Sequence, residues 1–191
     1  MKAFRLNRIF VLSLLAIVVF SGIPASRTAS AAFPDVSRAR SAMVASQHEL
    51  ASKIGADIMR RGGNAVDAAI AVGFALAVVY PEAGNIGGGG FMMIRKANGE
   101  TAAIDYREKA PAAAHRDIFI DKDGNLIRGE GSSTLGYRAS GVPGVVAGFE
   151  LAFKRHGSGK VKWSELVEPA RLLAQDGFVL SYRLAELFKA Y

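Results

Sequence analysis

One apolar segment, residues 65–79, constrains the fold of this chain more than any other feature of its sequence. It carries hydrophobic side chains on almost every face of a helix, so a helix here must be covered on all sides. Gly62 and Gly63 end a preceding helix, Asn64 is a good N-cap, and Pro81 stops the segment. A helix of about 15 residues reaches only ~22 Å, less than the ~30 Å of a bilayer core. The segment therefore predicts a core helix of a globular domain, with Ala and Gly residues that let a neighbouring element pack closely.

Periodicity and turn signals on either side predict shorter elements around this core helix. Asn98-Gly99 lies between two β-prone runs, residues 91–96 and 101–106, and predicts a hairpin. The Asp-rich stretch 121–125 lacks the later ligand positions and the closing Glu of a calcium loop, so it predicts a turn. The other expected elements are a strand at 43–46 and helices at 49–61, 143–155, 164–175 and from 182. Pro143, Ser164 and Ser181 are the residues expected to begin the last three of these helices.

The first 31 residues have the layout of a secretory signal peptide. Basic residues open it, residues 9–20 are an apolar run, and Ala29 to Ala31 form an A-x-A cleavage site. The apolar run is well short of the ~20 residues needed to span a membrane. We therefore expect residues 1–31 to be removed, residues 32–42 to be a loose segment, and the mature protein to be periplasmic or secreted. A signal that stays uncleaved and tethers the chain to the membrane is the alternative.

Charge and cysteine content exclude several classes of function. Without the signal the net charge falls from +7 to +3, because residues 1–31 hold four basic residues and no acidic one. So small a charge, with no clustered Lys/Arg face, argues against a nucleic-acid binder. The absence of cysteine excludes disulfides, a Cys nucleophile and thiolate metal sites. His48, His115 and His156 are scattered singly, so we expect polar or capping residues and no metal site.

No nucleotide-binding or serine-hydrolase motif is complete in this sequence. The run Gly87 to Gly90 lacks the sixth-position glycine of a dinucleotide loop, and it would run from helix to strand, the reverse of the required order. Gly157 to Lys160 resembles the end of a P-loop, but Val161 replaces the Ser or Thr that would hold magnesium. No serine lies in a G-x-S-x-G elbow, and the hydroxyls of Gly131 to Thr134 are typical of a loop.

Arg107 is the residue whose chemistry and position together suggest ligand binding. It directly follows the second predicted strand, and its guanidinium offers a planar fork that fits a carboxylate with two hydrogen bonds. The alternative is a surface arginine paired with Asp105 or Glu108. The residues alone leave both interpretations open, and the surface pair is the more ordinary of the two.

Five separated motifs follow one another in unbroken order along most of the chain. They are Met43 to Ser46, Gly62 to Ala69, Asn85 to Met92, Asp105 to Pro111 and Gly141 to Gly144, and the pairs Pro169-Ala170 and Gly177-Phe178 also fit the pattern. From Met43 to Tyr191 the chain resembles the γ-glutamyltransferase (glutathione hydrolase) family. The resemblance implies the α+β fold of N-terminal-nucleophile hydrolases, a four-layer α-β-β-α sandwich. Residues 43–191 would be only its N-terminal portion, a truncated first part of the large subunit.

The resemblance also implies an activity. Members are proenzymes that cleave themselves into a large and a small subunit, and the new N-terminal threonine of the small subunit attacks the γ-glutamyl amide of glutathione. The γ-glutamyl group then passes to water, an amino acid or a dipeptide, and no metal or organic cofactor is needed. The implied partners are glutathione and other γ-glutamyl compounds, these acceptors and the small subunit, with no nucleic acid and, after signal cleavage, no membrane.

Carried onto this chain, Arg107 matches the family arginine that holds the substrate α-carboxylate, and Glu108 would orient Arg107 or line the pocket. None of Thr28, Thr101 and Thr134 stands where the nucleophile belongs, so no catalytic residue is expected in this chain. The chain alone is therefore expected to be inactive, and poorly folded because its sheets lack partner strands. The alternative is a non-catalytic exported remnant that binds glutamate or γ-glutamyl compounds.

The family pattern also changes the interpretation of Gly87 to Gly90. Glycine allows positive φ and lets another backbone approach closely. We therefore expect this loop to pack tightly behind the active site, as a packing site rather than a ligand site.

Overall fold

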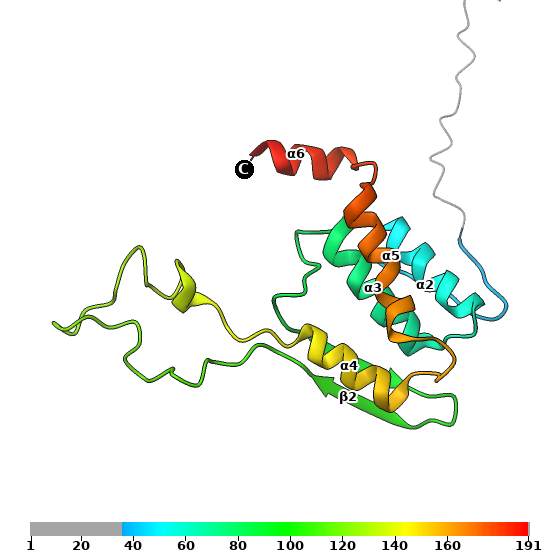
Figure 1. Cartoon of the computed structure of the whole chain (residues 1–191), viewed down its shortest axis with the longest axis horizontal. Helices are drawn as coiled ribbons and strands as arrows, with labels where there is room; N and C mark the ends of the chain where they lie inside the picture. The colour runs from blue at the N-terminus through cyan, green and yellow to red at the C-terminus, as the bar shows by residue number, and fades with distance from the viewer. Residues whose placement is uncertain (1–35, 191) are drawn as a thin grey trace, which may run out of the picture. The chain divides into compact units, whose positions relative to one another are not determined.

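The structure, a computed structural model, describes residues 36–190, so the predicted signal peptide lies outside the described residues. From Ala39 onward the chain forms one compact unit. Its elements are α2 (Glu49–Arg60), α3 (Ala65–Val79), β1 (Phe91–Arg95), β2 (Thr101–Asp105), the 3-10 turn η1 (Tyr137–Ala139), α4 (Val145–His156), α5 (Trp163–Asp176) and α6 (Tyr182–Ala190) (Figure 1). Within residues 36–190, no helix combines the length and the apolar character that crossing a membrane requires.

Helix α3 is the centre of the core, as its sequence predicts. Ile70 has no exposed surface, and α2 and α5 both pack against α3 (Figure 1). The ring of Phe74 meets Phe149 of α4 and Trp163 of α5 edge-on, at centroid distances of 5.3 and 5.6 Å. A Cβ on Gly73 would lie 2.4 Å from the ring of Phe149, which confirms the predicted close packing at small residues of this helix.

The predicted hairpin is present and covers part of this core. Strands β1 and β2 pair antiparallel along their full length, around a turn in which Gly99 has a φ of 87°. Ile94 and Ile104 are buried in the same cluster as α3, whereas Phe91 and Met93 are exposed on the other face. Helix α4 lies along β2 (Figure 1). The hairpin therefore has one covered face and one open face.

A polar junction fixes the beginning of α3 to the end of α4. The side-chain oxygen of Asn64 accepts hydrogen bonds from the N–H groups of Val66 (2.9 Å) and Asp67 (3.0 Å), which confirms the predicted N-cap. Asp67 is fully buried, and its Oδ2 accepts from the N–H groups of Asn64 (2.9 Å) and Ser158 (3.0 Å). The Asn64 amide also donates to the carbonyl of His156 at 2.7 Å. Two side chains thus satisfy backbone groups of both helix ends.

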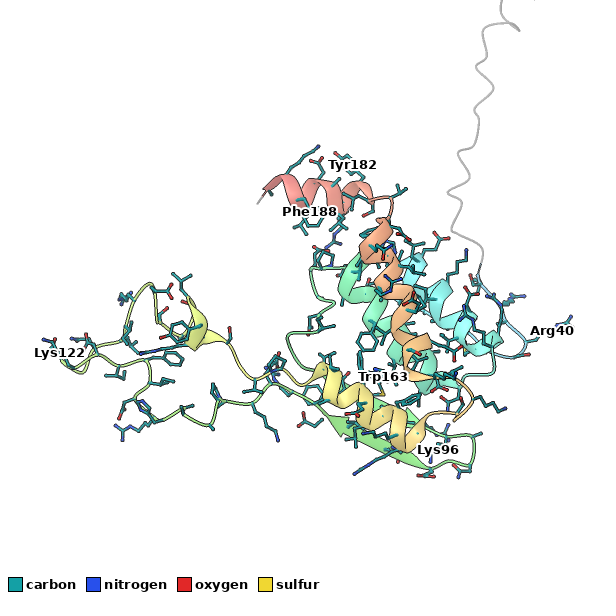
Figure 2. The ribbon with its side chains drawn as sticks, in the orientation of Figure 1. Arg40, Lys96, Lys122, Trp163, Tyr182 and Phe188 are labelled. Atoms are coloured by element: carbon teal, nitrogen blue, oxygen red, sulfur yellow. The ribbon has the colours of Figure 1, made fainter. Side chains whose placement is uncertain are left out.

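The long connection 110–141 between β2 and α4 is closed at its base. The N–H of Lys109 donates to the carbonyl of Val142 (3.3 Å), and the N–H of Val142 donates back to Lys109 (2.8 Å). Near Lys122 (Figure 2), Oδ1 of Asp121 accepts from the N–H groups two and four residues later, at 2.9 and 2.8 Å. A carboxylate that bonds its own backbone is typical of a turn, as predicted for this stretch.

Helix boundaries lie close to their predicted positions. Helix α2 ends at Arg60, one residue earlier than expected, and Ser181 begins α6 by accepting the N–H of Leu184 at 3.2 Å. Helix α4 begins two residues after Pro143, since the N–H of Val145 donates to a carbonyl outside the helix.

Two predicted details are wrong. Residues 43–46 form no strand in the described structure; Val44 instead packs against the apolar cluster between α2 and α3. A strand requires a partner strand for its backbone hydrogen bonds, and the described residues place none beside it. Ser164 does not cap α5, because that helix begins one residue earlier, at Trp163. At the beginning of α5 the Glu165 carboxylate accepts the N–H of Lys162 at 2.8 Å.

We expect Asp67→Ala to lower the free energy of unfolding of the chain by about 2 kcal/mol or more, because two backbone N–H groups lose their acceptor. The measurement is urea unfolding followed by fluorescence of Trp163, the sole tryptophan, which contacts Phe74 and Phe153. Asp57→Ala is the control, since the ion pair of Asp57 with Arg60 is exposed and should contribute less than about 0.5 kcal/mol. Equal losses in the two variants would contradict the role assigned to Asp67.

Candidate functional site

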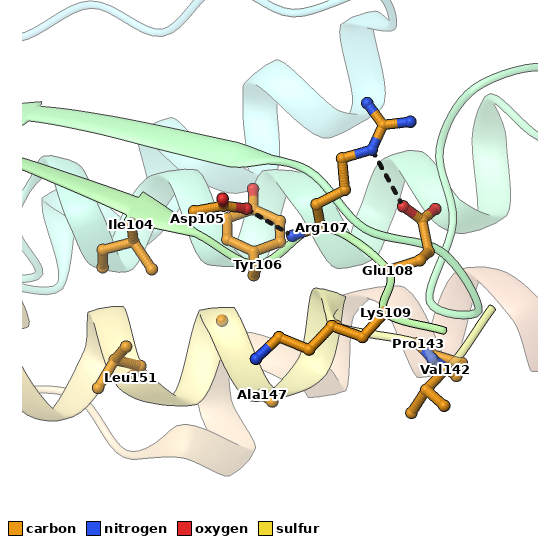
Figure 3. A pocket seen from close by; sticks show the side chains of 12 residues that line it. Ile104, Asp105, Tyr106, Arg107, Glu108, Lys109, Val142, Pro143, Ala147 and Leu151 are labelled. Carbon is orange, nitrogen blue, oxygen red and sulfur yellow. Dashed lines mark hydrogen bonds and ion pairs between the residues drawn. The ribbon is translucent and has the colours of Figure 1, made fainter. Parts of the chain in front are cut away.

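An open cavity of about 490 Å³ lies between the end of β2 and the beginning of α4 (Figure 3). The chain arrives from β2 and contributes residues 104–109, and it returns before α4 to contribute residues 142–144. Ala147, Gly148 and Leu151 of α4 complete the lining. The cavity therefore combines an apolar helix face with a charged strand end.

Arg107 presents its charge at this strand end. Its backbone N–H donates to Oδ1 of Asp105 at 3.0 Å, and its side chain is 70% exposed. Its guanidinium extends away from α4, with Nε 3.8 Å from Oε2 of Glu108 (Figure 3). An exposed pair at that distance contributes little net energy, so the guanidinium keeps most of its donors for another carboxylate. The guanidinium pairs loosely with Glu108, whereas Asp105 receives only the backbone N–H.

Glycines crowd around Glu108. A Cβ on Gly88 would lie 3.0 Å from Oε1 of Glu108, and one on Gly89 would lie 2.7 Å from Oε2. On the other side, a Cβ on Gly141 would lie 2.8 Å from Cβ of Glu108. The predicted tight packing is confirmed for Gly88, Gly89 and Gly90 but is wrong for Gly87, where a Cβ would meet no atom within 4 Å; none of the four glycines has a positive φ. Close approach, rather than an unusual backbone conformation, is what requires glycine here.

Tyr106 fixes the end of β2 on α4, and sequence reasoning did not single it out. A Cβ on Gly148 would lie 2.2 Å from its ring, and one on Gly144 would lie 2.0 Å from its carbonyl oxygen. Its hydroxyl donates to the carbonyl of Phe91 at 3.2 Å, and burial raises the pKa of this hydroxyl above its ordinary value of 10.0. The spacing of four residues between Gly144 and Gly148 could have indicated a helix face made for close packing.

The other residues considered from the sequence have structural roles. His48 caps α2, since its Nδ1 accepts the N–H of Leu50 at 3.2 Å, which confirms a capping role for this histidine. The hydroxyls of Ser132 and Thr134 lie 3.2 Å apart and pair with each other. Within residues 36–190, no three His, Asp or Glu side chains gather as metal ligands would.

Comparison with solved structures defines the class of protein. The crystal structure of Helicobacter pylori gamma-glutamyltranspeptidase superposes with a TM-score of 0.74 at 50% sequence identity, covering 81% of this chain and 43% of that chain. That protein has the N-terminal-nucleophile hydrolase fold, and the helices and small sheet of residues 36–190 are a partial α+β domain of it. The predicted fold class is confirmed.

Sequence comparisons identify the family. The model of the gamma-glutamyltranspeptidase family matches residues 51–191. Glutathione hydrolase proenzymes are 52% identical over 154 residues in Escherichia coli (strain K12) and 54% identical over 142 residues in Pseudomonas sp. (strain A14). These matches cover 81% and 74% of this chain but only 26% and 24% of those proteins, so the chain spans about a quarter of their length. The chain belongs to the γ-glutamyltranspeptidase family.

We expect the partly buried hydroxyl of Tyr106 to make stability fall at alkaline pH. Because its pKa in the folded state lies above 10.0, its contribution is complete below pH 10.0 and is lost as the pH rises through the folded-state pKa. Tyr106→Phe should therefore show a weaker fall than the wild type in urea titrations between about pH 8 and about pH 11. Tyr182→Phe, at an exposed tyrosine, should keep the wild-type dependence. Identical pH dependence in the wild type and Tyr106→Phe would refute this prediction.

Proposed function

We propose that this chain is the front part of the large subunit of a γ-glutamyltransferase that acts on glutathione and other γ-glutamyl compounds. In this proposal residues 1–31 are a cleaved signal, residues 32–42 a loose segment and residues 43–191 the large-subunit portion, in a periplasmic or secreted protein. The family match supports the activity, and the relatives named proenzymes support a precursor that is cleaved.

The observation that carries the proposal is the exposed guanidinium of Arg107 beside the cavity. Within residues 36–190 this guanidinium has one ion pair, a loose one, so it can bind a carboxylate by donating two parallel hydrogen bonds. Holding the α-carboxylate of a γ-glutamyl group in this way sets the distance to its γ-carbonyl carbon. A nucleophile at a fixed place then meets that carbon in a productive geometry, which lowers the entropic part of the barrier.

The nucleophile in this proposal is the N-terminal threonine of the small subunit of the same proenzyme. Its hydroxyl oxygen attacks the γ-carbonyl carbon, the amide C–N bond breaks, and the leaving amine takes up a proton. Water or the amine of an acceptor amino acid or dipeptide then attacks the ester and releases the threonine. The part assigned to residues 43–191 is to bind and orient the donor, without metal or organic cofactor.

A chimera tests the anchoring role, with residues 43–191 replacing the matching segment of the E. coli proenzyme. Arg107→Ala should raise KM for γ-glutamyl-p-nitroanilide, because losing a charge pair that the bound substrate and the rest of the enzyme shield from water costs on the order of 2–5 kcal/mol, roughly 30-fold to a few thousand-fold. Arg107→Lys should be intermediate, since it keeps the charge but loses the fork. Arg116→Ala is the control, because Arg116 is 94% exposed and pairs only with its neighbour Asp117.

An unchanged KM in Arg107→Ala would contradict the role of Arg107 in holding the substrate α-carboxylate. A chimera that cleaves itself and binds glutamate in calorimetry, yet turns over no substrate, would favour the non-catalytic binding remnant instead.

A further inference from the structure

The side chain of Glu108 sits between backbones that come from two distant parts of the chain. Gly88 and Gly89 belong to the loop after α3, and Gly141 belongs to the segment before α4. A Cβ on Gly89 would also lie 2.6 Å from the backbone nitrogen of Glu108 and 2.7 Å from Cα of Arg107. We call Gly88, Gly89 and Gly141 the glycine cradle. Because the contacts of Gly89 include backbone atoms, a methyl group there cannot be accommodated by a side-chain rotation alone.

The cradle is itself held by hydrogen bonds. Oδ1 of Asn85 accepts the N–H of Gly88 at 2.8 Å. The carbonyl of Gly88 in turn accepts the N–H groups of Gly144 (2.8 Å) and Val145 (3.1 Å) at the start of α4. Gly88 is therefore fixed between an amide side chain and a helix terminus, and its position relative to Glu108 is set by the fold.

The main chain at Glu108 is anchored on both sides as well. The N–H of Tyr106 donates to the carbonyl of Gly90 at 3.0 Å, and Lys109 exchanges two hydrogen bonds with Val142. The Glu108 side chain is 38% exposed, its carboxylate oxygens lie against Gly88 and Gly89, and its Oε2 lies 3.8 Å from Nε of Arg107. An exposed ion pair is usually weak because both side chains are mobile. Here one of the two partners has little freedom left.

From these contacts we infer that the glycine cradle and Asn85 are positioning residues for γ-glutamyl binding. They hold Glu108 where its carboxylate aims the guanidinium of Arg107. This inference rests on the proposed function, in which Arg107 binds the α-carboxylate. In this inference neither Asn85 nor the cradle touches the substrate; they act through Glu108 and, at Gly89, also through the backbone of Arg107.

The chain supplies a matched pair of substitutions for the test. Gly89→Ala adds a methyl group against the backbone of Glu108, whereas Gly87→Ala adds one where no atom lies within 4 Å. In the chimera, Gly89→Ala should raise KM for γ-glutamyl-p-nitroanilide by ~10-fold to ~100-fold, the range expected for an ångström-scale misplacement. Gly87→Ala should leave KM and kcat within about twofold of the wild type.

The split between KM and kcat separates positioning from loss of fold. A merely structural defect reduces the fraction of self-cleaved, active enzyme and so lowers kcat at unchanged KM. Asn85→Ala removes the acceptor of the Gly88 N–H without adding atoms, so this variant tests the inference even if Gly89→Ala does not fold. It should raise KM, and Asn85→Asp, which keeps an acceptor oxygen, should restore KM towards the wild-type value.

A double substitution gives the sharpest outcome. Glu108→Gln removes the charge that aims Arg107, so adding Asn85→Ala to it should raise KM little further. Full additivity of the two effects, or equal KM values in Gly89→Ala and Gly87→Ala, would overturn the inference. If Arg107→Ala also leaves KM unchanged, the proposed function itself fails. If Arg107→Ala raises KM but the cradle variants do not, Arg107 binds the substrate without help from the glycine cradle.

Discussion

The rest of the structure depends on the burial of α3, which leaves only Ala65 and Ala69 exposed among its residues. A helix without a polar face needs apolar partners over most of its surface, and α2, α5, α4 and the hairpin provide them. Both ends of such a helix bring backbone groups towards the core, where they need partners. At its start Asn64 and Asp67 supply these partners and bind the end of α4 at the same time. At the other end, the loop after α3 reaches the end of β2, where the N–H of Tyr106 donates to the carbonyl of Gly90 beside Arg107 and Glu108.

The candidate site follows from this scaffold by close contacts between backbones. Tyr106 lies flat against α4 because Gly144 and Gly148 leave room for it, and Glu108 enters the space left by Gly88 and Gly89. After these contacts the guanidinium of Arg107 remains largely exposed. Asp105, Glu108 and Lys109 are exposed beside it, and the guanidinium is the group among them whose planar fork fits a small carboxylate.

Local signals predicted most of the fold. The limits of α3, the hairpin around Gly99 and the cap at Asn64 depend on residues near one another in sequence, and they were confirmed. The strand expected at 43–46 failed because a strand depends on a distant partner that no local pattern specifies. The contacts of Tyr106 with α4 were missed for the same reason, since they join residues far apart in the chain. Arg107 was identified by its chemistry and by family resemblance together, and its role in binding stays a prediction.

The closed base of the connection 110–141 has a consequence for how this family can vary. Lys109 and Val142 hold its two ends together whatever the residues between them do. The entropic cost of a longer loop grows only slowly with its length once the ends are fixed. Between residues 112 and 140, insertions, deletions and changes of sequence can therefore accumulate between lineages without moving Arg107, whereas Gly141 packs against Glu108 and is not free to change. The same property makes the stretch 112–140 a suitable place to graft an epitope or a fluorescent label.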